Sequence, residues 1–295
     1  MKSNLDNSIN LKNVAGVVVL YNPEDSVIQN IESYIRQVGV LYIVDNSTEP
    51  RIFIRDYLKD NKHLIYIFNN FNIGVAAALN IGAKRAISDG FSYLLTMDQD
   101  SKTPDNMVES LLEIFDSLEN VGIVSPLHSN IFQTHKRFQA EKVTKVDGIM
   151  TSGNLISLGA YKVSGGFNED FFIDYVDVEY CLRLKNNNYN IYRVNNVVLE
   201  HKEANLSKRK IFSFTFYPTN NVPFRLYYKT RNLLYLRKQY HQYSHLLFQE
   251  YLLYFKSILK ILLFEEKKIL KVKMILLGVK DYFRKIKGAK ILNVG

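Results

Sequence analysis

The stretch VAGVVVL at residues 14–20 decides the fold, because it is a short and continuous apolar run rich in β-branched valine. Such a run is typical of a strand that is buried on both faces, as strands of parallel sheets are. Asn22-Pro23 then gives a turn signal, and Glu24-Asp25 favours the start of a helix, which we predict over 27–38. The chain therefore opens with a strand, a turn and a helix.

The same alternation continues through the first half of the chain. Short apolar runs predict further strands, and the segments between them have helical patterns. The predicted strands are 40–44, 64–68, 93–97 and 122–125, and the predicted helices are 51–59, 75–88 and 106–118. Strands that alternate with helices indicate an α/β fold, with a mostly parallel sheet and helices on both faces.

Polar residues follow four of the predicted strands. They are Tyr21-Asn22, Asp45-Asn46, the segment 69–74 and the segment 98–100. Ligands of open α/β sheets bind outside the carboxyl ends of the strands, so these loops lie where a ligand is expected. The alternative at each single place is an ordinary loop, because loops are polar in any protein.

Asp98-Gln99-Asp100 directly follows the predicted strand that ends in YLLTM. Two carboxylates two residues apart at the end of a strand can reach one hard divalent ion. Mg²⁺ and Mn²⁺ prefer oxygen ligands and are commonly shared with phosphates. The alternative is a loop with two solvated acids.

A second acidic group, Asp174, Asp177 and Glu179, follows the apolar segment 171–173. We predict a helix that begins near Asp174, on which Asp174 and Asp177 share one face and repel each other. This repulsion indicates a general base or a metal site, and a helix N-terminus, which favours acids, is the alternative. A lone histidine such as His201 is more often a surface residue than a ligand.

Composition excludes several classes of protein. Of the 295 residues, 47% are hydrophobic, which suffices for one sizeable core or for a main domain with an appendage. Cys181 is the only cysteine, so a disulfide scaffold and a cysteine metal cage are excluded. Residues 1–12 are polar, and no apolar run is long enough to cross a membrane, so we expect neither a signal peptide nor a spanning helix.

Charge divides the chain into an acidic body and a basic end. Residues 1–200 carry a net charge of −6 and residues 201–295 one of +15, which together give the +9 of the whole chain. This asymmetry indicates a polyanionic partner for the basic section, either anionic lipid or nucleic acid. No zinc-finger or RNA-recognition motif occurs, so we expect no nucleic-acid partner.

The basic section contains a predicted amphipathic helix over 246–264. Its apolar residues at helical spacing are Leu247, Tyr251, Tyr254, Ile258 and Leu262. A basic amphipathic helix predicts binding to an anionic membrane surface. The alternative is a helical cap on the preceding domain with a solvated basic face.

Taken in order, the motifs resemble those of the family 2 glycosyltransferases with the GT-A fold. They are VVLYNP (18–23), VDNS (44–47), NIGVAAALN (72–80), MDQDS (97–101), SGN (152–154), GGFNEDFFIDYVDVEYCLR (165–183) and His201. Within the family, the sequence is most similar to the bacterial dTDP-rhamnosyltransferases. The resemblance extends over roughly residues 13–235.

The resemblance implies a polar tail at 1–12, a GT-A catalytic domain at 13–215, and a helical, basic, membrane-associating region at 216–295. It also implies a role for each motif. The nucleotide-sugar pocket would comprise Tyr21, Asn22, Asp45, Asn72, Gly74, Asp98 and Gln99, with Asp45 on the base. The ligands of Mg²⁺ or Mn²⁺ would be Asp98, Asp100 and His201. Asp177 would be the catalytic base, with Glu179 the less favoured choice. The acceptor or donor sugar would lie near Ser152, Gly153, Asn154 and Asp174.

The reaction implied by the resemblance is a single displacement with inversion. An acceptor hydroxyl attacks the anomeric carbon of dTDP-rhamnose, Asp177 accepts the proton, and the metal neutralises the leaving diphosphate. The acceptor would be a saccharide or lipid-linked saccharide in cell-surface polysaccharide synthesis. The enzyme would then be cytoplasmic and peripheral at the inner face of a bacterial membrane. The alternatives are a UDP-sugar transferase and a non-catalytic protein that binds nucleotide or nucleic acid.

Two positions depart from the family pattern. Leu79 stands where many members carry an arginine that contacts the diphosphate, and Lys84, Arg85, Lys229 or Arg231 could replace that contact. Val176 stands where many relatives carry an acid, which leaves Asp177 or Glu179 as the base.

Overall fold

The computed structural model describes residues 13–58, 61–129, 141–201, 209–211, 214–216 and 220–292, and the predicted tail 1–12 lies outside them. Contacts divide the chain into two compact units. The first unit comprises Met1–Phe167 and Tyr180–Lys202, and the second comprises Asn168–Glu179 and Glu203–Gly295. This division differs from the predicted boundary at 215/216, because 168–179 packs with the C-terminal helices. The predicted roles of the two regions stay predictions.

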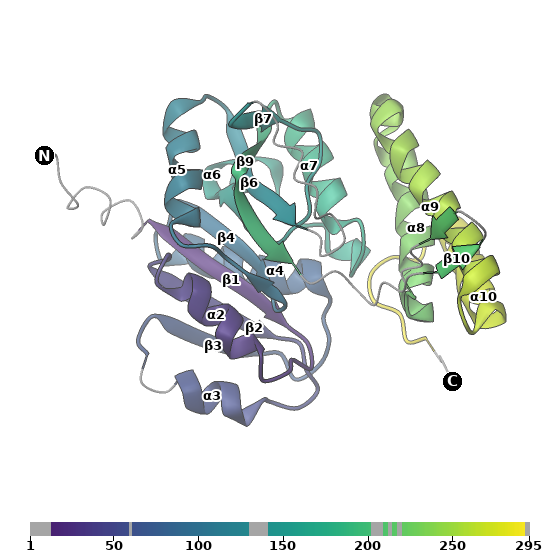
Figure 1. Cartoon of the computed structure of the whole chain (residues 1–295), viewed down its shortest axis with the longest axis horizontal. Coiled ribbons are helices and arrows are strands. Elements are labelled where there is room, and N and C mark those ends of the chain that lie inside the picture. Colours follow the sequence, from purple (N-terminus) through teal and green to yellow (C-terminus); the bar gives the residue numbers. More distant parts are fainter. Residues whose placement is uncertain are drawn as a thin grey trace, which may run out of the picture. The chain divides into compact units, whose positions relative to one another are not determined.

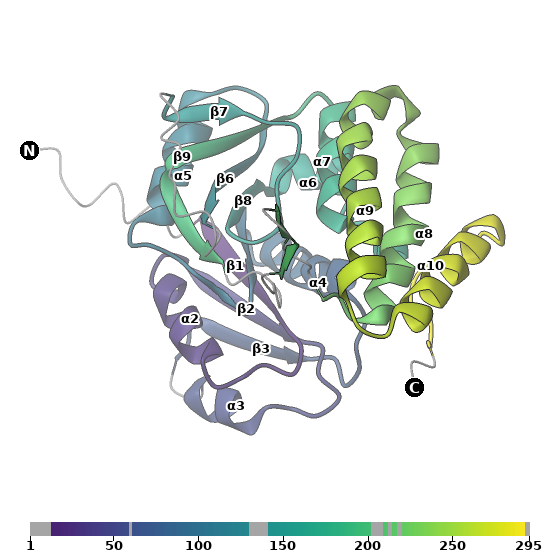
Figure 2. The ribbon, with the colours of Figure 1, turned by 45° about the vertical axis from the view of Figure 1, so that its right-hand side comes forward.

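Within the described residues, the first unit is built on one large mixed sheet of order β3-β2-β1-β4-β8-β6-β9-β5, with β7 paired to β9 (Figures 1 and 2). Its strands are β1 (Val14–Leu20), β2 (Val40–Asp45), β3 (Leu64–Phe68), β4 (Tyr93–Asp98), β5 (Ser101–Lys102), β6 (Val121–Ser129), β7 (Val143–Lys145), β8 (Asn154–Ser157) and β9 (Asn190–His201). The half β3-β2-β1-β4 is parallel, and the antiparallel β8 joins it to the parallel pair β6 and β9. The predicted α/β class with a mostly parallel sheet is confirmed.

Helices cover both faces of this sheet. They are α2 (Val27–Ile35), α3 (Ile52–Leu58), α4 (Val75–Ser88), α5 (Met107–Ser117), α6 (Leu158–Ser164) and, across the boundary between the units, α7 (Val176–Asn186). In Figure 1, α2 lies in front of the sheet and α4 behind it. Right-handed crossovers that run in opposite directions from β1 place their helices in this way.

The VAGVVVL strand lies at the centre of the core, as its continuous apolar character predicts. Val14, Val17 and Val18 are fully buried in β1. At Gly82 of α4, an added Cβ would stand 2.3 Å from a side-chain atom of Val17. The Ala-rich helix therefore packs close to β1 because it carries glycine at the contact.

The second unit is largely helical. It contains the short helices η1 (Glu169–Phe171) and η2 (His241–Tyr243), the helices α8 (Pro223–Gln239), α9 (Ser244–Phe264) and α10 (Lys268–Phe283), and the hairpin β10 (Arg209–Ile211) with β11 (Phe214–Phe216). The predicted C-terminal helices are thus present. In the part of the chain that the structure describes, no helix has the length and apolar character needed to cross a membrane.

Helices α8 and α10 are in close contact. A Cβ at Gly278 of α10 would lie 2.6 Å from the carbonyl oxygen of Tyr227 in α8. Charged side chains beneath α10 are buried in pairs, with Lys271 Nζ 2.6 Å from Glu265 Oε2. Asp281 accepts a hydrogen bond from the Tyr227 hydroxyl at 2.9 Å. The underside of α10 therefore packs against α8 and against Glu265, which precedes α10.

Candidate functional site

The parallel register brings the polar strand ends to one edge of the first unit. Leu20 at the end of β1 pairs with Asp45 at the end of β2, and Val19 pairs with Asp98 at the end of β4. The loops that begin at Tyr21, Asp45 and Asp98 therefore leave the sheet side by side, as predicted. This carboxyl edge is where ligands of open α/β sheets bind.

Hydrogen bonds tie these loops together. The Tyr21 amide donates to Gln99 Oε1 at 2.8 Å, and Asn30 Nδ2 donates to the Gln99 carbonyl at 2.8 Å. The Asn22 amide donates to Ser47 Oγ at 2.8 Å, and its Oδ1 accepts from Arg51 Nη2 at 3.0 Å. The side chain of Gln99 thus binds the loop after β1, and hydrogen bonds join the loops in which the pocket is predicted.

Asp45 is fully buried at this edge. Its Oδ1 accepts from the Ser47 amide at 2.8 Å, and its Oδ2 accepts from the Tyr66 hydroxyl at 2.5 Å. Burial raises the pKa of Tyr66, and the hydrogen bond to Asp45 raises it further. A contact from Asp45 to a nucleotide base therefore requires that the carboxylate exchange one partner or accept an additional hydrogen bond.

The loop 69–74, which follows β3, is held by a series of hydrogen bonds that involve asparagine side chains. Asn69 Nδ2 donates to Asn46 Oδ1 at 2.9 Å, and Asn46 Nδ2 donates to the Gly74 carbonyl at 3.1 Å. The Gly74 amide donates to Asn72 Oδ1 at 2.9 Å, and Gly74 has a φ of 89° just before α4. The side chain of Asn72 thus shapes the turn that leads into α4, next to the Asp45 loop.

The Asp98-Gln99-Asp100 loop lies against the predicted third metal ligand. Asp98 is half-buried and Asp100 is exposed. Ser101 pairs with His201 in the β5–β9 ladder, so the backbone of His201 lies beside this loop. Among the described side chains, which do not include that of His201, no three metal-binding residues cluster. Two carboxylates and an imidazole are donors that a hard divalent ion shared with phosphates accepts, so the donor set fits the predicted ion.

The Ser152-Gly153-Asn154 segment holds the loop 98–100 through hydrogen bonds of Ser152. Ser152 Oγ accepts from the Asp98 amide at 3.1 Å and donates to Ser101 Oγ at 2.7 Å. Gly153 has a φ of 77°, and its Cβ would stand 2.7 Å from Leu199. Ser152 and Asn154 are buried. In this structure the segment positions the acidic loop, and its predicted sugar contact stays a prediction.

The departure at Leu79 places an apolar side chain in the core, and the next residue has a structural role that the sequence did not reveal. Leu79 is buried. Asn80 Oδ1 accepts from the Tyr161 hydroxyl at 2.7 Å and from the Phe167 amide at 2.8 Å, and its Nδ2 donates to the Phe167 carbonyl. Arg85 pairs with Asp89 at the far end of α4, about 16 Å from Gly74 along the helix. It therefore offers no replacement beside the nucleotide loops.

In the second unit, the predicted helix is present and begins at Val176, two residues after Asp174. Asp174 has a φ of 63°, so it lies in the left-handed region before the helix, and the prediction that Asp174 and Asp177 share a helical face is wrong. Asp174 instead forms an ion pair with Arg225 of α8, with Nη2 2.6 Å from Oδ1. This pair gives Asp174 a countercharge, although the charge of Asp174 still acts on Asp177.

Asp177 lies in the first turn of α7, where its Oδ1 accepts from the Val178 amide at 2.9 Å. Burial, the backbone hydrogen bonds that oppose it and the charges of Asp174 and Glu250 together raise the pKa of Asp177 to about 6, and burial is the largest cause. A carboxylate with a pKa near the working pH is a stronger general base than one near 4. Its environment thus suits the predicted role.

Glu179 has a different environment. It is buried, and its Oε1 accepts from the Tyr240 hydroxyl at 2.7 Å, just past the end of α8. The structure therefore gives Glu179 a structural partner, in keeping with Asp177 as the favoured base.

Arg231 is fully buried, and its guanidinium holds backbone within the second unit. Nη2 donates to the Asp170 carbonyl at 2.9 Å and Nη1 to the Gly288 carbonyl at 2.8 Å, while the Asn232 side chain accepts from Nε. This geometry leaves no exposed donor for the predicted diphosphate contact. Lys229 is partly exposed, with Nζ 3.9 Å from Asp174 Oδ1, and it stays a candidate for the diphosphate contact.

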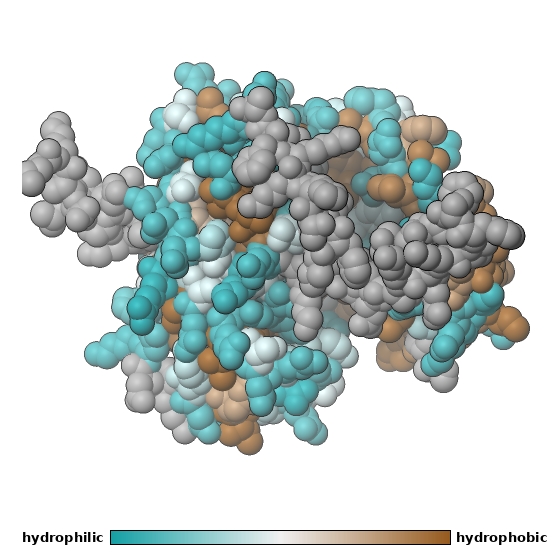
Figure 3. All heavy atoms as spheres, in the orientation of Figure 1, coloured by the Kyte–Doolittle hydropathy of each residue, from teal (hydrophilic) through white to brown (hydrophobic). Residues whose placement is uncertain are grey.

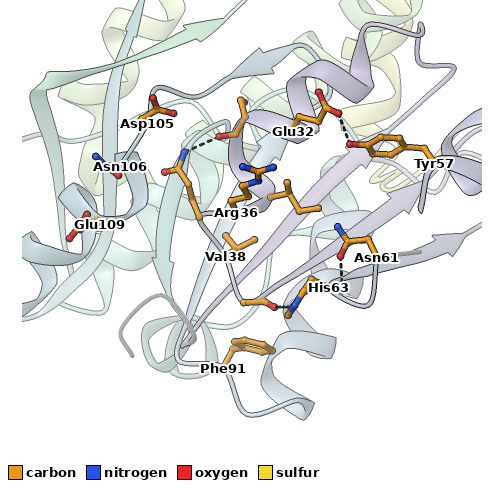
Figure 4. Close-up of a pocket in the computed structure, with 14 residues that line it drawn as sticks. Glu32, Arg36, Val38, Tyr57, Asn61, His63, Phe91, Asp105, Asn106 and Glu109 are labelled. Atoms are coloured by element: carbon orange, nitrogen blue, oxygen red, sulfur yellow. Dashed lines mark hydrogen bonds between the residues drawn. The ribbon is translucent and has the colours of Figure 1, made fainter. Parts of the chain in front are cut away.

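A groove of about 1310 Å³ lies at the opposite edge of the sheet (Figure 4). It is lined by residues at the amino ends of the strands and by α2 and α5, among them Arg36, His63 and Glu109. His63 Nδ1 lies 2.9 Å from the Gly39 carbonyl, and the Tyr57 hydroxyl donates to Glu32 at 2.7 Å. None of the sequence-predicted site residues lines this groove.

Comparisons with known proteins match the chain to glycosyltransferases. The model of the family described as Glycosyl transferase family 2 matches residues 17–168. The chain is 28% identical over 249 residues to "dTDP-rhamnosyl transferase RfbF" from Shigella flexneri, which covers 78% of this chain and 81% of that protein. It is 25% identical over 203 residues to "Low-salt glycan biosynthesis hexosyltransferase Agl10" from Haloferax volcanii, which covers 61% of this chain and 64% of that protein.

Solved structures of low sequence identity share the fold. S. aureus TarS 1-349 in complex with UDP-GlcNAc superposes with a TM-score of 0.61 at 12% identity, over 92% of this chain and 81% of that one. GalNAc-T7 with UDP, GalNAc and Mn²⁺ superposes with a TM-score of 0.56 at 14% identity, over 66% of this chain and 44% of that one. The predicted GT-A fold is thereby confirmed.

Proposed function

We propose that this chain, which belongs to glycosyl transferase family 2, transfers L-rhamnose from dTDP-rhamnose to a saccharide or lipid-linked saccharide. The observation that carries the donor is the likeness to the Shigella flexneri dTDP-rhamnosyl transferase over 78% of the chain. The pre-assembled loops at the carboxyl edge, from Tyr21 to Gln99, support a nucleotide pocket in the first unit. In this proposal, the product enters cell-surface polysaccharide synthesis.

The proposed reaction is one displacement at the anomeric carbon. An acceptor hydroxyl oxygen forms the new bond, the bond from that carbon to the diphosphate breaks, and dTDP leaves with the bonding pair. Asp177 takes the proton of the hydroxyl, which its pKa of about 6 favours at neutral pH. Because no enzyme nucleophile intervenes, the configuration inverts.

The proposed cofactor is Mg²⁺ or Mn²⁺, held by Asp98, Asp100 and His201. When bound, such an ion offsets the charge that develops on the leaving diphosphate. The chain prepares the loop through Ser152, whose hydroxyl accepts from the Asp98 amide and donates to Ser101. Loop position is therefore set by buried hydrogen bonds and does not depend on the ion alone.

The second candidate function is transfer from a UDP-sugar by the same chemistry. The similar TarS and GalNAc-T7 structures contain UDP or UDP-GlcNAc, which is the observation that favours it. Low identity limits those likenesses to the fold. A non-catalytic nucleotide-binding protein is the candidate from a different class, and the presence of Asp98, Asp100, Asp177 and His201 together speaks against it.

The test measures nucleotide binding and donor hydrolysis by the purified full chain. dTDP-rhamnose is compared with UDP-glucose and UDP-galactose, each with and without Mn²⁺. Metal-dependent selectivity for dTDP-rhamnose supports the proposal. Selective use of a UDP-sugar would favour the second candidate, and a folded protein that binds none of the three would favour the non-catalytic one.

A further inference from the structure

We infer that the outer faces of α9 and α10 form one docking surface for an anionic lipid bilayer, which is an interaction separate from sugar transfer. The stripe predicted from the sequence of α9 faces mainly inward: Leu247 is buried, and Tyr251, Tyr254 and Ile258 are half-buried. The outward side of α9 carries a second apolar stripe that the structure identifies.

The outer stripe of α9 follows steps of four and three residues, which place its members on one side of a helix. Its members are Phe248, Leu252, Phe255, Leu259 and Leu262, and all are exposed. All five are phenylalanine or leucine, so this stripe carries no charge. A helix face of this width is usually covered by another element, and within the described part of the second unit these side chains stay exposed.

Helix α10 repeats the spacing with a different composition. Ile269, Leu276 and Phe283 are 75%, 61% and 75% exposed, and Lys273 and Lys280 lie between them on the same side. Apolar side chains that alternate with lysines suit the boundary between acyl chains and headgroups. There the apolar groups insert and the ammonium groups reach anionic phosphates.

Helix α10 carries lysines on both sides, and they are buried on the inner side and exposed on the outer side. Beneath the helix, Lys271 is buried against Glu265 at 2.6 Å. On the outer side, no ion pair of Lys273 or Lys280 is found among the described residues. The fold therefore neutralises the charge of Lys271, whereas the charges of Lys273 and Lys280 remain available to an anionic surface.

The two outer stripes are contiguous along the chain. Leu262 and Leu263 at the end of α9 and Ile269 at the start of α10 are all exposed around the connection. Figure 3 shows hydrophobic residues, in brown, and hydrophilic ones, in teal, next to one another at the right of the view. These exposed residues link the two stripes at the α9–α10 connection, so the proposed surface includes both helices.

Charge decides between the possible occupants. A second copy of the chain would bring lysine rows against lysine rows, whereas the anionic headgroups of a bilayer would neutralise them. A neutral apolar partner would leave the lysines without a role. An anionic lipid surface satisfies both the apolar and the basic members of the stripes.

The test measures binding of the purified full chain to vesicles by flotation. Vesicles of phosphatidylcholine with about one third phosphatidylglycerol are compared with pure phosphatidylcholine. The double variant Lys273→Gln with Lys280→Gln should bind the anionic vesicles about thirtyfold more weakly. The matched control Lys273→Arg with Lys280→Arg keeps the charge and should bind like the parent. Leu276→Ser with Phe283→Ser should weaken binding even though all charges remain.

Equal binding to neutral vesicles, or equal binding of the Gln and Arg double variants, would overturn the inference. So would a stable dimer in sedimentation that Leu276→Ser with Phe283→Ser dissociates, because the face would then bind a second copy. Circular dichroism confirms folding of these surface variants. Nucleotide binding is measured in parallel, so a failure of the proposed donor chemistry is distinguishable from a failure of lipid docking.

Discussion

Arg225 holds the carboxylate of Asp174 with two hydrogen bonds, from Nε to Oδ2 at 3.1 Å and from Nη2 to Oδ1 at 2.6 Å. Asp174 is one of the two acids whose charges raise the pKa of Asp177. Arg225 therefore does not touch the proposed base, but it neutralises a charge that acts on the base. It is a positioning residue that the sequence did not single out.

Arg225→Ala should raise the pKa of Asp177 above its value of about 6, because Asp174 would lose its countercharge. The acidic limb of the pH profile of kcat/KM should move to higher pH. Arg225→Lys keeps the charge and should move it less. Loss of the partly exposed pair should lower the free energy of unfolding by about 1–2 kcal/mol. An unmoved acidic limb in a folded Arg225→Ala protein would contradict the coupling.

Asp177→Asn should reduce transfer by about 10²–10⁴-fold, since the proton acceptor is lost. In the parent, kcat/KM should fall on the acid side with a midpoint near pH 6. Glu179→Gln serves as the matched control, because Glu179 is held by Tyr240 and should leave that midpoint in place. A midpoint that moves with Glu179 would transfer the role of base to that residue.

Asp177→Asn should also stabilise the fold at neutral pH. The carboxyl of Asp177 has a higher pKa folded than unfolded, so its ionisation weakens the fold as pH rises through that range. The gain on substitution should be about 2–3 kcal/mol at pH 7 and should vanish near pH 4, below the folded pKa. Thermal or denaturant unfolding at the two pH values measures it. Equal stability at pH 7 would mean that the carboxyl is not buried in solution.

Arg231→Met should lower the free energy of unfolding by about 3–5 kcal/mol, because the Gly288 carbonyl loses its donor and the Asp170 carbonyl keeps only the Gly288 amide. Its affinity for dTDP should stay at the parent value where the protein remains folded. Arg231→Lys, with fewer donors, serves as the milder variant. If Arg231→Lys kept its stability but lost affinity for dTDP, that result would support the predicted contact between Arg231 and the diphosphate.

Asp100→Asn should weaken Mn²⁺ binding more than about tenfold, since loss of even an indirect partner of a metal ligand has that effect. The fold should be unaffected, because Asp100 is exposed. Glu200→Gln removes an exposed acid opposite Lys102 on the neighbouring strand and serves as the control. Mn²⁺ titration by electron paramagnetic resonance, with and without dTDP, gives a readout that does not depend on turnover. Chelation by EDTA should abolish donor hydrolysis, and added Mn²⁺ should restore it.

The first half of the fold could be predicted because its strands are buried on both faces and therefore appear as unbroken apolar runs, as in VAGVVVL. β9 was missed because it does not alternate regularly. Asn195 and Asn196 interrupt it, and its register with β6 shifts between Pro126 and Leu127. A bulge moves side chains from one face to the other, which erases the period on which a prediction from sequence depends.

The edge location of the nucleotide loops could be predicted, but their internal bonding could not. Parallel strands place Asp45 and Asp98 at one edge whatever the side chains do. The bond from Tyr66 to Asp45 depends on how β3 is registered on β2, and the side chain of Asp174 is bound by Arg225, 51 residues away. Partners at such separation leave no local pattern in the sequence.

The segment 170–174, which leads into the proposed base, takes its shape from one helix. Asn232 of α8 donates to the carbonyls of Phe171, Ile173 and Asp174 at 2.9–3.0 Å. For chimeras between members of this family, the consequence is a rule about crossovers. Segments 168–179 and 203–295 must come from the same parent, and no crossover should fall at 179/180, where it would cut α7.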